Sequence, residues 1–303
     1  MALIRINAEG RKPVLHGTDA PLMPVLNRAL ETNGPITVML HGYKFQPNSA
    51  QHCPHAHIFA PIDANCAKAV SWPDRLGFLS QSENSGVGIA FGWHARGSLK
   101  QALRSAVRAS FALATLIRQI RRVAPHRRIN LVAHSMGAYL SLQTIHRLSS
   151  GDIGRVIFLN GAVFRPCVAA ALRTDAGKHV ELFNIVSSEN AFYDILFERL
   201  LGRPGSHDRS IGRGFDAPNA LTIRLDNRTT LSNLSTLGHD IARPSYWFCH
   251  WSPYLREGAM AFYSDLLRKP DVFSLERLQT RLAPRNCLAA SRSSMPPPSC
   301  STV

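Results

Sequence analysis

Residues 129–142, INLVAHSMGAYLSL, contain a serine whose position suits nucleophilic chemistry. An apolar run typical of a buried strand ends just before Ser135, and a small-residue helical pattern follows at once. A serine on such a tight turn is held in a strained backbone conformation that lifts its hydroxyl clear of the sheet. Nearby backbone then comes so close that only small residues fit two positions to either side, and Ala133 and Gly137 meet that demand. The pattern therefore predicts nucleophilic catalysis through Ser135.

Ser135 also fits a simpler role. Serine is a favoured helix N-cap, and AHSMG could be no more than a cap after a buried strand. However, residues 40–43, LHGY, follow another apolar run upstream, and the family resemblance described below implies that the fold brings both segments around one carbonyl. The helix that begins after Ser135 also places the backbone N–H of Met136 where a developing oxyanion can be bound. These features favour catalysis over capping.

A catalytic serine needs two partners, because a hydroxyl is a poor nucleophile at neutral pH. A histidine must accept its proton, and an acid must orient that histidine. The acids that follow later apolar runs are Glu189 and Asp194, with Asp226 and Asp240 as lesser candidates. The histidines further along the chain are His239 and His250.

Strands and helices are expected to alternate along the chain. Apolar runs rich in β-branched residues predict strands at 3–8, 36–42, 87–93, 129–134, 155–161, 180–187 and 221–226. Patterns with helical spacing lie at 21–32, 98–123, 136–149, 191–201 and 255–268. This alternation predicts an α/β fold, with a central, mostly parallel β-sheet flanked by helices on both faces.

The domain is expected to span residues 1–268, with two long irregular segments inside it. Residues 43–86 and 202–219 are rich in Pro, Gly, Ser or charge, and we expect them to form pocket walls or lids. From residue 269 to residue 303 the pattern weakens and ends in SRSSMPPPSCSTV. This composition predicts a disordered C-terminal tail.

Two motifs at strand ends resemble those of the α/β-hydrolase family. The nucleophile turn of that family is matched by AHSMG, with alanine in place of the first glycine of GxSxG. Its oxyanion loop is matched by MLHGY. The resemblance covers approximately residues 35–268, and VMLHGYKF, IAFGWHARG and HSMGA are similar to an uncharacterised bacterial branch of the superfamily. It implies the fold and the type of reaction, and it leaves the substrate open.

The resemblance also implies roles for single residues. In this family the second oxyanion donor is the backbone N–H of the residue after His-Gly, which is Tyr43 here. The triad residues follow the order Ser, acid, His, and the histidine precedes the last helix, which favours His250 over His239. Aspartate is the usual acid, which favours Asp194. Glu189 lies nearer to the strand end and is a close alternative.

The composition excludes several classes of protein. The chain is 45% hydrophobic, and it contains no apolar stretch of about 20 residues that could span a bilayer. Its first residues lack the apolar core of a signal peptide, so a cytoplasmic location is expected. Six cysteines are scattered without CxxC spacing, which is typical of reduced thiols.

A net charge of +15 permits attraction to polyanions. The positive charges are dispersed and no aromatic-interleaved basic motif accompanies them, so nucleic-acid binding is not expected. Weak contact with an anionic membrane surface remains an expectation. Residues 51–57, QHCPHAH, hold side chains that zinc prefers, but they lack a second ligand pair. Neither a metal nor another cofactor is expected.

Together these features predict a serine hydrolase of the esterase or lipase type. It would cleave the carboxylic ester or thioester of a small-molecule acyl substrate through an acyl-enzyme on Ser135. An acyltransferase would use the same triad and is one alternative. The other is a binding protein that has the fold without the catalysis and docks on an anionic surface.

Overall fold

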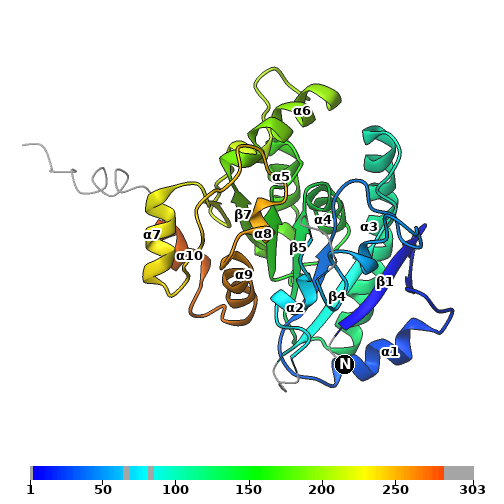
Figure 1. Cartoon of the computed structure of the whole chain (residues 1–303). Helices are drawn as coiled ribbons and strands as arrows, with labels where there is room; N and C mark the ends of the chain where they lie inside the picture. The colour runs from blue at the N-terminus through cyan, green and yellow to red at the C-terminus, as the bar shows by residue number, and fades with distance from the viewer. Residues whose placement is uncertain (1–2, 64–68, 81–84, 283–303) are drawn as a thin grey trace, which may run out of the picture.

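A computed structural model describes residues 3–63, 69–80 and 85–282 of the 303-residue chain. At its centre lies an eight-stranded sheet with the order β2-β1-β4-β3-β5-β6-β7-β8 (Figure 1). β2 pairs antiparallel with β1, and each other neighbouring pair is parallel. The strands are Leu3–Glu9 (β1), Lys12–Leu15 (β2), Ile36–Leu40 (β3), Val87–Gly92 (β4), Ile129–His134 (β5), Arg155–Leu159 (β6), Glu181–Val186 (β7) and Ala220–Arg224 (β8).

Helices cover both faces of the sheet. One apolar cluster joins the sheet to α1, α3, α4 and α5, and a second joins its other face to α2, α7, α8, α9 and α10. The helices are Leu22–Leu30 (α1), Trp72–Arg75 (α2), Leu99–Val123 (α3), Gly137–Ile145 (α4), Arg165–Leu172 (α5), Ala191–Leu201 (α6), Arg228–Thr236 (α7), Ser252–Leu255 (α8), Ala259–Arg268 (α9) and Leu275–Leu282 (α10). The expected α/β-hydrolase fold class, a mostly parallel sheet flanked on both faces, is therefore confirmed.

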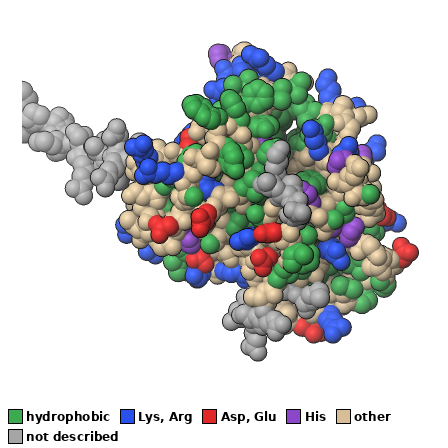
Figure 2. Space-filling view, in the orientation of Figure 1, with side chains coloured by type: hydrophobic (Ala, Val, Ile, Leu, Met, Phe, Trp, Pro, Cys, Tyr) green, Lys and Arg blue, Asp and Glu red, His purple; other side chains and the backbone are tan. Residues whose placement is uncertain are grey.

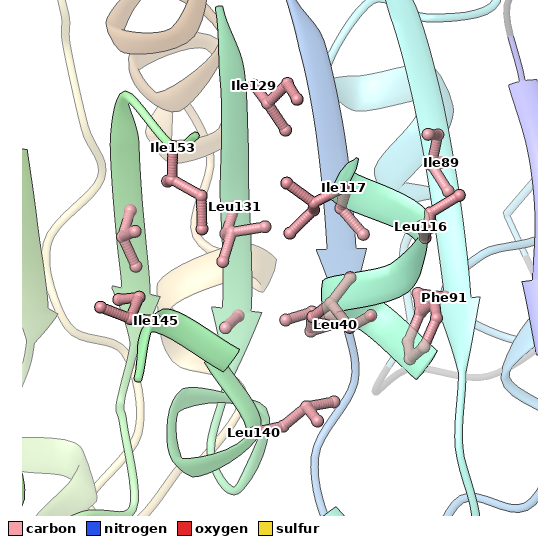
Figure 3. Close-up of a cluster of buried hydrophobic side chains, with 14 of the residues drawn as sticks. Leu40, Ile89, Phe91, Leu116, Ile117, Ile129, Leu131, Leu140, Ile145 and Ile153 are labelled. Atoms are coloured by element: carbon pink, nitrogen blue, oxygen red, sulfur yellow. The ribbon is translucent and has the colours of Figure 1, made fainter. Parts of the chain in front are cut away.

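The alternation of side chains along the strands explains why the central strands are mostly apolar. Leu131 belongs to the cluster on one face of the sheet and its neighbour Val132 to the cluster on the other. Figure 3 shows Leu131 of β5 in the same cluster as Ile117 of α3 and Leu140 of α4. Because helices cover both faces of the sheet, neither face offers solvent-exposed positions at which polar side chains would alternate with apolar ones.

β2 was not expected from the sequence. It has four residues, begins with lysine and proline, and lies at the edge of the sheet. Such a strand has no long apolar run, because only the edge of β1 supports it. The short helices α5, α7 and α10 were also not expected. Each has eight or nine residues, which gives a weak helical pattern.

Part of the expected C-terminal tail belongs to the folded domain. Leu275 and Leu278 of α10 are buried in the second cluster, so the expectation of disorder is wrong for this helix. Arg155 of β6 explains how the chain is held there. Its guanidinium is buried and donates to the carbonyls of Leu266 at 2.6 Å and Pro270 at 3.1 Å. Residues 283–303 of the expected tail lie outside the described residues.

Residues 43–86 are more than a loop, within the parts that the structure describes. Phe59, Trp72 and Phe78 from this segment are fully buried in the second cluster. Only its beginning, Tyr43 to Phe45, reaches the cavity described below. The segment therefore contributes mainly to the core.

Two further findings concern the described residues alone. None of their helices is both long and apolar enough to cross a bilayer. Their cysteines, Cys53, Cys167 and Cys249, are free thiols.

Candidate active site

Ser135 occupies the turn between β5 and α4. Its φ of +54° lies in the left-handed region, which is uncommon for any residue other than glycine. The turn is held by hydrogen bonds, because Ser135 N–H donates to the carbonyl of Leu159 at 3.1 Å, while its own carbonyl accepts from Ala162 N–H at 3.0 Å. The N-cap of α4 is Met136, and no side chain caps this helix. Ser135 therefore does not play the simple capping role.

Two glycines allow the chain to close around this turn. A Cβ atom on Gly42 would lie 2.7 Å from Cβ of Ser135. A Cβ atom on Gly137 would lie 2.8 Å from the carbonyl oxygens of both Leu40 and His41. Contacts this short do not occur with real side chains, so both positions require glycine. The end of β3 is thereby packed directly against the serine turn.

His41 fixes the loop that follows β3. Its Nε2 accepts a hydrogen bond from the Trp93 backbone N–H at 3.0 Å, and its Nδ1 lies 2.9 Å from the carbonyl oxygen of Gly42. Complete burial lowers the pKa of His41 to about 3, so the ring is neutral at pH 7. Nδ1 therefore carries the ring proton and donates it to Gly42. His41 thus holds the loop in place.

The backbone amides of Tyr43 and Met136 lie at the two segments brought together in this way. Both residues line the cavity that contains Ser135. Neither amide donates a hydrogen bond to another described residue. Two such N–H groups beside a nucleophilic serine are suited to bind the oxyanion of a tetrahedral intermediate.

His250 lies in the loop before α8, and its backbone and ring are both fixed. Its carbonyl accepts hydrogen bonds from His134 Nε2 at 3.1 Å and from Asn160 Nδ2 at 3.0 Å. Burial lowers the pKa of His134 to about 4, so that ring is neutral and its proton sits on Nε2. The ring of Tyr193 stacks on the His250 imidazole with 4.9 Å between centroids.

The side chain that meets His250 Nδ1 is Asn190. Its Oδ1 atom lies 2.6 Å from Nδ1. Its Nδ2 atom lies 3.0 Å from Oδ2 of Asp194, and an ionised carboxylate can only accept. The amide nitrogen must therefore face Asp194 and the amide oxygen must face His250. Because that oxygen can only accept, Nδ1 of His250 carries the proton and Nε2 keeps its lone pair.

The protonation state of His250 suits a general base. Burial, together with the nearby His134 ring, lowers the pKa of His250 well below its usual value. The imidazole is therefore neutral at pH 7. A neutral imidazole with a free lone pair on Nε2 can accept the proton of a serine hydroxyl.

Asp194, the acid favoured from the sequence, is linked to His250 only through Asn190. It lies in the first turn of α6, where it also accepts a hydrogen bond from Ser210 Oγ at 2.6 Å. Burial raises its pKa to about 6, and the bonds from Ser210 and Asn190 oppose that rise. Gly212 leaves room for this carboxylate, since a Cβ there would lie 2.0 Å from Oδ2. The expected direct contact between Asp194 and the histidine is not present.

Glu189, the alternative acid, also makes no contact with the His250 ring. Its carboxylate forms an ion pair with Arg256, and the side chains are 3% and 4% exposed. It also accepts from Ser187 Oγ at 3.0 Å and from Tyr246 N–H at 3.2 Å. A buried carboxylate needs such partners, which draw it away from the imidazole. The Glu189 backbone carbonyl accepts from Cys249 N–H, so this residue braces the loop that carries His250.

The remaining candidates lie elsewhere. His239 has its Nε2 atom 3.4 Å from Oδ2 of Asp265, and its ring packs against Phe262 and Phe273. It belongs to the far cluster and does not line the Ser135 cavity. Asp226 pairs with Arg224 at 3.3 Å, and Asp240 is exposed.

Ser135 and His250 line one cavity of about 410 Å³. Its apolar walls are formed by Phe45, Leu99, Leu196, Phe197, Leu200 and Trp251. Helix α6 thus supplies much of the wall. Among the described residues, none of 202–219 lines this cavity, contrary to the expectation that this segment walls the pocket. The segment instead carries Ser210, which holds Asp194.

Asn190 and Tyr193 were missed by the sequence reasoning. Asparagine is an uncommon partner for a catalytic histidine, and the acids on either side of it in SENAFYD drew attention first. One signal was available, because an Asn at the N-cap of a helix after a sheet strand can direct its amide to a neighbouring loop. Nothing in the spacing of Tyr193 indicates that it stacks on His250.

The mostly parallel sheet, with a left-handed serine turn between β5 and α4, defines the class of α/β hydrolases. A protein-family model described as "alpha/beta hydrolase of unknown function" (DUF900) matches residues 23–165, which include both Tyr43 and Ser135. The chain therefore has the α/β-hydrolase fold, and a little under half of its length matches this family model. A search of curated proteins found no match.

Several solved structures are similar to the chain at low identity. Phospholipase PlaB from Legionella pneumophila, in complex with thio-NAD, shows 12% identity over 58% of this chain and 43% of its own, with a TM-score of 0.33. The metagenomic carboxyl esterase MGS0156 shows 15% identity over 55% of this chain and 56% of its own, with a TM-score of 0.31. A lipase-esterase related protein from Clostridium acetobutylicum shows 10% identity over 65% of this chain and 89% of its own, with a TM-score of 0.33. The chain thus spans less than two thirds of the first two structures.

Proposed function

We propose that the protein is a serine hydrolase that cleaves carboxylic ester or thioester bonds through an acyl-enzyme on Ser135. One observation carries this proposal. Ser135, in its left-handed turn, lines the same cavity as His250, and the Nδ1 proton of His250 is held by Asn190. These observations support the assignment of Ser135 as nucleophile, His250 as general base and Asn190 as the group that orients the base.

The reaction proceeds in two balanced steps. Ser135 Oγ attacks the substrate carbonyl while His250 Nε2 takes the serine proton, and the oxyanion receives the N–H groups of Tyr43 and Met136. The bond to the leaving alcohol or thiol breaks as His250 returns that proton to it. Water then attacks the acyl-enzyme, again losing its proton to His250, and the carboxylic acid is released with the Ser135 hydroxyl restored.

The cavity supports an acyl substrate. Its apolar walls suit a hydrocarbon chain, because burial of apolar surface is favourable in proportion to the area removed from water. Ser135, His134 and His250 are among the polar residues that line the same cavity. This lining supports a substrate whose carbonyl lies at Ser135 and whose apolar group packs against the side chains of α6.

Labelling by a fluorophosphonate, combined with turnover of p-nitrophenyl esters of graded acyl length, tests the proposal. Ser135→Ala should abolish labelling and lower kcat by about 10⁶-fold. Ser141→Ala is the matched control, since its hydroxyl is buried in α4 and donates to the Gly137 carbonyl. Equal labelling of the wild type and Ser135→Ala would exclude Ser135 as the nucleophile. Full turnover by His250→Ala would exclude His250 as the base.

A further inference from the structure

Helix α6 has its polar and apolar sides inverted. Its acids Asp194 and Glu198 are buried, whereas Phe192, Ile195 and Leu200 are exposed. Each acid is held by polar partners, since Asp194 accepts from Ser210 and Asn190, while Glu198 pairs with Arg203 at 2.7 Å. The helix is thus fixed to the domain through its carboxylates. An ordinary surface helix would bury its apolar side instead.

The exposed side of α6 continues into a neighbouring aromatic loop. Trp247 is 92% exposed and Phe248 is 65% exposed. The rings of Phe192 and Phe248 are in contact, with 5.7 Å between centroids. We call this joint region the α6 surface, and it consists of Phe192, Ile195, Leu196, Leu200, Tyr246, Trp247 and Phe248. Figure 2 shows hydrophobic side chains gathered where Figure 1 places α6.

The α6 surface is continuous with the cavity of Ser135. Leu196 and Leu200 belong to both, because they are exposed and also line the cavity. An apolar molecule that leaves a lipid phase at this surface would therefore reach the cavity along the side chains of Leu196 and Leu200. Most other large hydrophobic side chains of the described chain are buried.

The exposed charges on α6 and on the aromatic loop are positive, and the exposed acid Glu257 lines a pocket beside Tyr246 and Arg243. Arg199 of α6, Arg243 before the aromatic loop and Lys44 at the cavity are all exposed. Within the described chain, Arg199 and Arg243 form no ion pair with an acid. The acids of residues 189–204 are all buried, and residues 243–250 contain no acid. The exposed cations Lys44, Arg199 and Arg243 therefore complement an anionic partner.

We propose that the α6 surface binds the surface of an anionic phospholipid bilayer and that lipid acyl esters enter the Ser135 cavity from it. Exposed Trp and Tyr beside aliphatic residues and cations are suited to the boundary between headgroups and acyl chains. A second copy of the chain would bring the same positive charges face to face, which opposes dimerisation through this surface. The choice of substrate rests on the proposed hydrolase function, whereas the binding does not.

Sedimentation with lipid vesicles tests the binding separately from catalysis. The full chain with Ser135→Ala is mixed with phosphatidylcholine vesicles and with vesicles that also contain about one third phosphatidylglycerol. We expect binding to the anionic vesicles, with a blue shift of Trp247 emission, and weaker binding at high salt. Phe192→Ser and Trp247→Ser should each lower the partition coefficient about tenfold. Val123→Ser is the control, because Val123 is exposed at the end of α3 opposite to the cavity residue Leu99.

The outcomes separate the two proposals. Absence of vesicle binding, or equal binding by Trp247→Ser and the Val123→Ser control, would overturn the bilayer proposal. So would a dimer in light scattering that Phe192→Ser dissociates, since it would identify a second copy as the partner. Vesicle binding without fluorophosphonate labelling of the wild type would support the proposal that the α6 surface binds a bilayer and would refute the proposed hydrolase function. When Ser135 is retained, Phe192→Ser and Trp247→Ser should hydrolyse soluble p-nitrophenyl acetate as the wild type does and lose activity on vesicle lipids.

Discussion

The amide oxygen of Asn190 lies 2.6 Å from Nδ1 of His250 and occupies the position where a carboxylate was expected. A carboxylate at this position would be charged, whereas the amide is neutral. The negative charge lies on Asp194, which accepts a hydrogen bond from the other end of the Asn190 amide. This bond fixes which end of the amide meets the imidazole. Asn190 therefore orients the His250 imidazole, and a different residue, Asp194, carries the negative charge nearby.

Asn190→Ala should lower kcat on the order of 10²–10³-fold, because His250 would lose the acceptor that keeps the proton on Nδ1. Steady-state kinetics with a p-nitrophenyl ester would measure the loss, and KM should change little. Asn233→Ala serves as the control, since Asn233 donates to the Arg281 carbonyl at the surface. If Asn190→Ala and Asn233→Ala have the same kcat, Asn190 does not orient the base.

The pH dependence of kcat/KM should show an acid limb below pH 6.5. The base is active only when neutral, and burial lowers the pKa of His250, so protonation removes activity only at a pH below the ordinary histidine value. Initial rates across the acid range would define the limb. A midpoint above pH 6.5 would contradict the burial of this ring.

Asp194→Asn should change how stability depends on pH. Burial raises the pKa of Asp194 from 3.8 to about 6, so the folded state disfavours the charged form. The stability that the protonated Asp194 carboxyl group contributes to the fold is fully present below pH 3.8 and is lost as the pH rises through about 6. The unfolding free energy of the variant, relative to that of the wild type, should therefore increase by about 3 kcal/mol as the pH rises from 3.8 to above 6. Denaturant titrations at pH 4 and pH 8 would measure it, and a pH-independent difference would rule out the raised pKa.

Glu189→Gln should destabilise the fold by about 3–5 kcal/mol, because it leaves the Arg256 charge buried without its partner. The loop that carries His250 should loosen as well, so kcat should fall together with stability. Asp63→Asn breaks the exposed pair with Arg75 and should cost less than about 1 kcal/mol. Unfolding midpoints in urea would compare the two variants. Equal losses would show that the buried pair contributes no more than the exposed one.

The strands other than β2 and the serine turn could be predicted because their sequences are locally determined. The apolar run of β5 ends at His134, and the small residues around Ser135 report how closely the backbone packs there. Asn190 could not be found in this way, because its partner His250 is distant in sequence. The direction in which Glu189 points depends on Arg256, which is equally distant. The roles of Ser135 and His250 remain predictions.

The inversion of α6 was also hidden from the sequence. AFYDILFERLL shows which residues are apolar, but not which side of the helix faces the domain. That orientation is set by polar contacts from residues 202–219, which were expected to form a lid and instead hold α6 from behind through Ser210. The spacing of apolar residues within α6 carries no information about contacts with residues outside the helix.

The near-contact of Gly42 with Ser135 has a consequence for turnover. Under the proposed mechanism, the loop after β3 and the serine turn are packed together before any substrate arrives, so little reorganisation energy is needed when negative charge develops on the carbonyl oxygen. Adaptation to different acyl groups must then come from the walls of the cavity rather than from its reactive end.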